Sequence, residues 1–135
     1  MIILVRHGRT HLNASRCLQG HVDADLDELG AQQAEAVGQY LTNEISPARI
    51  ISSPLRRAQQ TAAAIASHCG VTDVETDERW IEIDYGIYDG LPLGDVPREV
   101  WNQWRTQPNF VPEGGESFAT LHDRVHAACR ELVQS

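Results

Sequence analysis

The hydrophobic pattern of the chain alternates short apolar runs with longer amphipathic stretches. Residues 2–5 are Ile, Ile, Leu and Val, an uninterrupted run typical of a strand buried on both faces of a parallel sheet. A second run at residues 50–51 and a weaker one at residues 71–76 predict two further strands. Apolar residues recur at helical spacing between and after these runs. The alternation predicts an α/β protein with a mostly parallel sheet.

Capping residues indicate where the helices begin and end. Asp27 is a candidate N-cap for a helix that reaches about Thr42. Ser53 followed by Pro54 predicts the start of a helix that Gly70 ends.

Two more helices are expected in the second half of the chain. One covers residues 96–106, and Ser117 predicts the start of a last helix with an apolar stripe that includes Leu121 and Val125. Residues 9–25 show neither the helical nor the strand period of apolar residues and are expected to form a loop. A loop of this length in a small domain usually serves a function. Internal repeats are not visible.

Composition and charge narrow the class of protein. The 135 residues fit one domain, and 41% hydrophobic with 22% charged residues are ordinary globular values. No apolar run approaches the roughly 20 residues of a membrane span, and the N-terminus lacks a signal peptide, so we expect a cytoplasmic protein without a membrane partner. A net charge of -8 argues against a nucleic-acid partner.

Three cysteines, Cys17, Cys69 and Cys129, are odd in number and widely spaced. This spacing argues against a disulfide framework and against a thiolate metal site. We expect them to be small core residues.

Candidate chemistry gathers at the predicted strand ends. Arg6 and His7 directly follow the first strand, at the edge where α/β sheets bind ligands. Arg56 and Arg57 lie in the first turn of a helix, where cations oppose the dipole, so an anionic ligand explains at least one of them. Guanidinium groups around one imidazole suit a clamped phosphoryl group and a nitrogen nucleophile.

A carboxylic acid would then protonate the departing alcohol oxygen. Acidic residues follow the third predicted strand, and the residues alone leave the choice open among Glu78, Glu82, Asp84 and Asp89.

Several motifs in order along the chain carry a resemblance. The chain resembles the histidine phosphatase superfamily, the phosphoglycerate mutase-like proteins, from residue 2 to about residue 125. The matching residues are Leu4-Val5-Arg6-His7-Gly8 with Thr10 and Asn13; Arg16 with Gln19-Gly20; Ser52-Ser53-Pro54-Leu55 with Arg57-Ala58 and Thr61-Ala62; Glu82, Gly86 and Asp89-Gly90; and Pro112 with Gly115-Glu116-Ser117. The resemblance implies a three-layer α/β/α fold with a mostly parallel central sheet.

The resemblance also implies a role for each site residue. His7 is the nucleophile that becomes phosphohistidine, and Glu82 is the general acid and later the base. The residues expected to bind the phosphoryl group or approach the substrate are Arg6, Arg57, Asn13, Gln19 and Gly20. The implied partners are a small phosphorylated substrate and inorganic phosphate, with no cofactor and no metal.

The chain departs from the family pattern at two points. Arg9 stands where the family usually has Glu, which we expect to add charge near the pocket. The family's second site histidine lies on a later strand before a glycine, and His122 and His126 cannot be carried over onto it because they fall on the last helix. We therefore expect residues 1–135 to form one domain that lacks its carboxyl-terminal strands. The open sheet edge of such a truncated chain offers a surface for homodimerisation.

The compact run over residues 90–116 resembles the phosphatase branch, so the predicted function is phosphomonoester hydrolysis. Phosphoglycerate mutase activity, an isomerase reaction, is the nearer alternative. A non-catalytic phosphate-binding fragment or pseudoenzyme without the second histidine is the alternative from another class.

Three other features have simpler interpretations. His122 and His126 lack the Glu of a zinc motif and indicate an exposed helix face. The acidic residues at positions 23, 25 and 27 lack the Gly and Glu of a calcium loop and indicate a helix start. Trp101 and Trp104 either pack in a core or cover the site as a lid.

Overall fold

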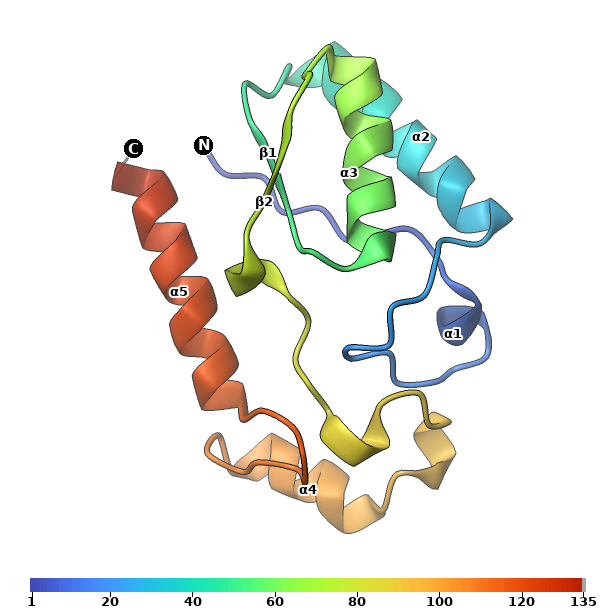
Figure 1. Cartoon of the computed structure of the whole chain (residues 1–135), viewed down its shortest axis with the longest axis vertical. Helices are drawn as coiled ribbons and strands as arrows, with labels where there is room; N and C mark the ends of the chain where they lie inside the picture. The colour runs from blue at the N-terminus through green and yellow to red at the C-terminus, as the bar shows by residue number, and fades with distance from the viewer. Residues whose placement is uncertain (135) are drawn as a thin grey trace.

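Helices and short strands alternate in the computed structural model, which describes residues 1–134 (Figure 1). The helices are α1 (His11–Ala14), α2 (Glu28–Glu44), α3 (Arg56–Cys69), α4 (Arg98–Thr106) and α5 (Phe118–Gln134), the strands are β1 (Ile50–Ser52) and β2 (Val74–Thr76), and the 3₁₀ turns are η1 (Glu78–Trp80), η2 (Gly86–Tyr88) and η3 (Leu93–Asp95).

The strands β1 and β2 are parallel, with Ile50 opposite Val74 and Ser52 opposite Thr76. Helices α2 and α3 lie together on one side of this pair, and α5 stands on the other side (Figure 1). This arrangement confirms the predicted α/β class with a parallel sheet.

Helices α2 and α3 pack through small and branched side chains. Ala34 and Leu41 of α2 are buried, as are Ala62, Ile65 and Ala66 of α3. The small residues let the two helices approach closely, which confirms the apolar stripes predicted from the sequence.

Three capping predictions are confirmed. The carboxylate of Asp27 accepts a hydrogen bond from the Gly30 amide at 2.8 Å and begins α2. Gly70 ends α3 with a positive φ of 69°. The hydroxyl of Ser117 accepts from the Thr120 amide at 3.1 Å at the start of α5.

The predicted start of α3 is wrong by two residues. The helix begins at Arg56, and the residue before it, Leu55, makes no side-chain cap. Asp23, from the preceding loop, takes this role, because its carboxylate accepts from the Arg56 amide at 2.7 Å. A carboxylate distant in sequence therefore replaces the local Ser53 cap.

The loop predicted over residues 9–25 is also more ordered than expected. It contains the single turn α1, which Thr10 and Asn13 hold in a capping box. The pattern misses this turn because one turn of helix is too short to show a period. Smaller differences concern the boundaries, since β2 begins at Val74 and α4 at Arg98.

The N-terminal segment, residues 2–5, is the largest departure from the sequence prediction. It is extended but not part of a sheet, and Leu4 is 75% exposed while the other three side chains are 39–41% exposed. No strand within residues 1–134 pairs with it. A strand needs a hydrogen-bonded neighbour and two covered faces, and this segment has neither.

A second core is built around Trp104, which is 6% exposed. Tyr85 and Trp101 pack edge-to-face on it, with ring centroids 5.1 and 5.2 Å away. Trp101 and Trp104 therefore act as packing residues, of which Trp101 is half-buried.

The prediction of core cysteines is wrong, since all three cysteines are free and partly exposed.

Gly8 and Gly30 bring α2 directly against the chain that follows His7. A side chain at Gly8 would collide with the backbone of Gly30, and one at Gly30 would collide with the backbone of Arg9. The absence of two Cβ atoms thus sets the distance between the helix and the site. Within the described residues, no helix has the length and hydropathy needed to span a membrane.

Candidate active site

A groove of about 1140 Å³ runs between the N-terminal segment, β1, α3 and α5. Much of its wall is apolar, with Ile2, Ile51 and Val125 among the lining residues. The lining also includes all seven site residues expected from the sequence: Arg6, His7, Asn13, Gln19, Gly20, Arg57 and Glu82.

The His7 ring is held by the backbone of the residue that follows it. Its Nδ1 lies 2.7 Å from the carbonyl oxygen of Gly8, which can only accept, so Nδ1 carries the proton. The Gly8 amide in turn donates to Thr61 Oγ1 on α3 at 3.0 Å. In the neutral ring, Nε2 is then the nitrogen with the free lone pair.

Electrostatics favour this neutral ring. Burial lowers the pKa of His7, and the positive charges of Arg57 and Arg6 lower it further. The Gly8 carbonyl and the Glu82 carboxylate act in the opposite direction, but the net pKa lies below 6.5. His7 is therefore a neutral nitrogen base near pH 7.

Arg57 is the most deeply buried charge of the site, with 1% of its surface exposed. Its guanidinium donates to the carbonyl oxygens of Gly20 at 2.9 Å and Val22 at 2.8 Å. Burial lowers the pKa of Arg57, and the Glu82 carboxylate partly offsets this. The two carbonyls fix the guanidinium plane and leave other N–H groups for an anion.

The neighbouring Arg56 has a different role. Its guanidinium lies on the surface and forms an ion pair with Asp25 at 2.8 Å. Asp25 thus accounts for one of the two cations at the start of α3, and Arg57 is the one left for a ligand.

Thr10, Asn13 and Gln19 form a hydrogen-bonded unit beside Arg57. The Thr10 hydroxyl is fully buried and donates to Gln19 Oε1 at 2.6 Å. Asn13 Oδ1 accepts from the Thr10 amide at 3.0 Å. Because this bond uses the Asn13 oxygen, the amide nitrogen of Asn13, which lines the groove, remains available as a donor.

Gly20 has a positive φ of 49°, and a side chain there would collide with the Asp89 carboxylate. Asp89 accepts from the amides of His21 at 3.1 Å and Tyr85 at 3.2 Å. Burial raises the pKa of Asp89, and these two bonds partly offset the rise. Asp89 therefore ties the loop to the acidic segment and does not face the groove.

Glu82 is the acid that does face the groove. Of the four acids that the sequence left open, Glu82 alone lines it within the described residues. Its Oε1 accepts from the Ile83 amide at 2.8 Å. Its charge acts on both His7 and Arg57. Glu82 therefore remains the candidate for the acid role that the resemblance implies.

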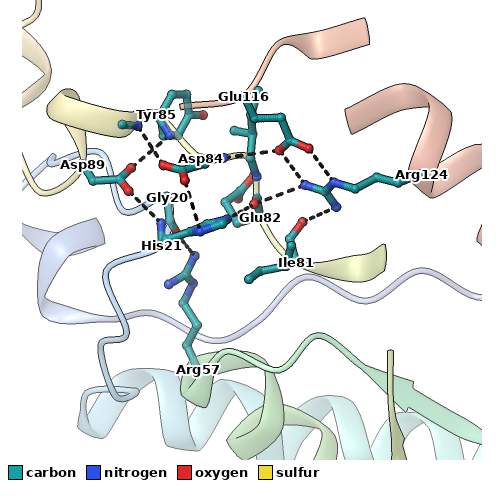
Figure 2. Close-up of polar contacts among 12 residues, drawn as sticks. Gly20, His21, Arg57, Ile81, Glu82, Asp84, Tyr85, Asp89, Glu116 and Arg124 are labelled. Atoms are coloured by element: carbon teal, nitrogen blue, oxygen red, sulfur yellow. Dashed lines mark hydrogen bonds and ion pairs between the residues drawn. The ribbon is translucent and has the colours of Figure 1, made fainter. Parts of the chain in front are cut away.

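Sequence reasoning missed two residues near Glu82, His21 and Arg124, and gave no role to Glu116, although Glu116 lies in one of the matching motifs. His21, Glu116 and Arg124 surround its backbone in Figure 2. Arg124 lies 42 residues from Glu82 in sequence and His21 lies 61 residues away. Their contacts are to backbone carbonyls, which no side-chain motif records, so no signal in the sequence would have found them.

Other expectations about the site are corrected or limited. Arg9 adds no charge to the groove, because it lies outside the lining and pairs with Asp27 at 2.6 Å. His122 and His126 are exposed and stack 5.6 Å apart on α5, as the sequence indicated. Among residues 1–134, no three His, Cys, Asp or Glu side chains are grouped so as to hold a metal ion.

Comparison with known proteins identifies relatives of the chain. The family model described as "Histidine phosphatase superfamily (branch 1)" matches residues 2–135. A protein of Yersinia pestis (strain Pestoides F), named "Probable phosphoglycerate mutase GpmB", is 43% identical over 139 residues, covering 97% of this chain and 63% of that protein.

Two solved structures are similar to this one. A mycobacterial glucosyl-3-phosphoglycerate phosphatase in complex with VO3 superposes with a TM-score of 0.87 at 34% identity, covering 96% of this chain and 62% of the other. A phosphoglycerate mutase from Thermus thermophilus superposes with a TM-score of 0.78 at 25% identity, covering 93% and 68%. The chain thus spans about 63% of the length of the curated relative it matches.

Proposed function

The chain belongs to the histidine phosphatase superfamily (branch 1), and from this premise we propose that its groove hydrolyses phosphomonoesters through a phosphohistidine. The substrate is a small phosphorylated metabolite. One observation carries the proposal: His7, with its Nδ1 proton fixed on the Gly8 carbonyl, shares the groove with Arg57 and Glu82.

The first step transfers the phosphoryl group to the enzyme. Nε2 of His7 attacks phosphorus, and the new P–N bond forms as the ester P–O bond breaks. Arg6 and Arg57 hold the non-bridging oxygens and stabilise their charge. The carboxyl group of Glu82 gives its proton to the departing alcohol oxygen.

The second step returns the enzyme to its starting state. The Glu82 carboxylate takes a proton from water, and the water oxygen attacks phosphorus as the P–N bond breaks. Inorganic phosphate leaves, His7 is again neutral, and Glu82 is again protonated. In both steps the arginines supply the positive charge that stabilises the phosphoryl oxygens.

Phosphoglycerate mutase activity is the second candidate. The 43% identity to a probable phosphoglycerate mutase favours it. In that reaction the phosphohistidine gives its phosphoryl group to another hydroxyl of the sugar acid instead of water. The compact run over residues 90–116 and the similarity to a phosphatase structure favour hydrolysis.

The test is turnover of p-nitrophenyl phosphate near pH 6 with EDTA present. We expect nitrophenolate release that His7→Ala abolishes and that the exposed control His122→Ala leaves unchanged. Turnover that survives His7→Ala would refute the phosphohistidine. Vanadate binding without turnover favours a phosphate-binding protein, and faster interconversion of phosphoglycerates than phosphate release favours the mutase.

A further inference from the structure

The segment that carries Glu82 is held in place by side chains from other parts of the chain. Residues 81–84 have no regular secondary structure. The guanidinium of Arg124 on α5 donates to the carbonyl oxygens of Ile81 at 2.6 Å and Glu82 at 3.3 Å. Nε2 of His21 donates to the same Glu82 oxygen at 2.8 Å. The Glu82 carbonyl thus has donors from the loop and from α5.

Glu116 fixes the direction of Arg124. Its carboxylate accepts from Nε at 2.7 Å and from a terminal nitrogen at 2.8 Å, the bidentate geometry of a strong pair (Figure 2). The side chains are only 17% and 15% exposed. The bond to Arg124 also lowers the pKa of Glu116, so the pair stays ionised.

The same glutamate also holds the other end of the segment. The backbone amide of Glu116 donates to the Asp84 carbonyl at 2.9 Å, and its carboxylate accepts from the Asp84 amide at 3.4 Å. The Asp84 carboxylate lies 3.5 Å from Nδ1 of His21. Arg124, Glu116 and His21 thus form one network that contacts the backbone at both ends of residues 81–84.

The geometry points to Arg124 and His21 as positioning residues for proton transfer by Glu82. Glu116 orients the guanidinium of Arg124. This inference rests on the proposed function. The Glu82 carboxyl group is fixed to its own segment by the Ile83 amide, so a displaced peptide moves the acid. A displacement of about 1 Å is enough to lower a rate by about 100-fold.

Leaving-group dependence separates a positioning role from a merely structural one. An alkyl phosphate such as glycerol phosphate needs a proton on its leaving oxygen, whereas p-nitrophenyl phosphate releases a stable anion. We expect Arg124→Met to lower kcat for the alkyl ester by about 10- to 100-fold and for the aryl ester by less than about 3-fold. In a Glu82→Gln background, Arg124→Met should have almost no further effect on the alkyl ester.

Matched variants guard against a folding defect. Arg130→Met removes an exposed arginine of the same helix and should leave kcat unchanged for both substrates. His21→Leu removes the second donor from a surface loop and should repeat the split, while His21→Gln, which can still donate, should restore part of the alkyl rate. An equal loss on both substrates in folded Arg124 and His21 variants would overturn the inference.

A measurement without turnover tests the same contacts in the full chain. The Ile83 amide proton reports the Glu82 carboxylate in an NMR pH titration, because it donates to Oε1 at 2.8 Å. We expect this response to disappear in Arg124→Met and to persist in Arg130→Met. An unchanged Ile83 response in Arg124→Met would refute the positioning role. Absent wild-type turnover would instead refute the proposed function.

Discussion

Two arginines reach the same groove from regions that are built very differently. Arg57 is 1% exposed at the start of a helix, and two loop carbonyls fix its guanidinium. Arg6 is exposed, follows an extended segment without a sheet partner, and makes no hydrogen bond or ion pair within residues 1–134. Hydrogen bonds within the fold preorganise Arg57, whereas no such bonds among the described residues hold Arg6. An arginine can therefore place positive charge in a groove whether or not its side chain also stabilises the fold.

The largest effect is expected at the buried arginine. Arg57→Met removes the guanidinium proposed to bind the phosphoryl group. It leaves the Gly20 carbonyl without its hydrogen-bond donor, whereas the Val22 carbonyl still accepts from the Ala24 amide at 3.1 Å. We expect phosphatase activity to fall by about 100- to 1000-fold and the free energy of unfolding to fall by about 1–3 kcal/mol. Kinetics with chemical denaturation measure both, and Arg56→Met, an exposed pair, should change stability by less than about 1 kcal/mol.

Arg6 should separate activity from stability. Arg6→Met is expected to lower activity by about 10- to 100-fold because a charged contact to the transition state is lost. The unfolding free energy should change by less than about 0.5 kcal/mol, since the side chain is exposed. Arg105→Met, which changes an exposed arginine outside the groove, is the control. A large loss of stability in Arg6→Met would contradict the comparison.

The smallest effect is a shift in the titration of His7. Burial is the main cause of its lowered pKa, and the arginines add to it. Removing Arg57 should therefore raise the pKa of His7 slightly, and removing Arg6 should raise it less. The acidic limb of kcat/KM moves to higher pH in the same order, because the lone pair of Nε2 is needed. An NMR titration of the ring measures this directly.

The lowered pKa also predicts the pH dependence of stability. In the unfolded chain His7 titrates near its ordinary value of 6.5, so below that pH the unfolded state binds the proton first. The His7 contribution should be constant above pH 6.5 and become destabilising as pH falls toward the folded pKa. His7→Ala should remove this dependence in denaturation curves measured at several pH values.

Local chemistry made much of the fold predictable. Asp27 and Gly70 mark helix ends because a cap and a positive φ depend on one or two residues. The start of α3 could not be predicted, since the carboxylate that caps it comes from Asp23 in another segment. Residues 2–5 look like a buried strand in composition, but burial depends on a neighbour that the pattern does not describe.

The candidate site divides along the same line. Its seven residues were identified through motif resemblance, and the groove brings them together. The residues around the Glu82 backbone stayed invisible, because Arg124 on a polar helix face looks like any solvated arginine. Contacts from side chains to a distant backbone are a property of the folded chain.

The contact between Gly8 and Gly30 has a consequence for how this sequence can vary. Each glycine faces the backbone of the opposite segment. A side chain added at one position would therefore collide with backbone atoms, and no substitution at the other position removes them. Alanine should therefore be destabilising at both positions, although Gly30 lies inside a helix, where alanine is ordinarily favoured. Helical propensity and the close approach of α2 to the chain after His7 thus exert opposite selection on Gly30.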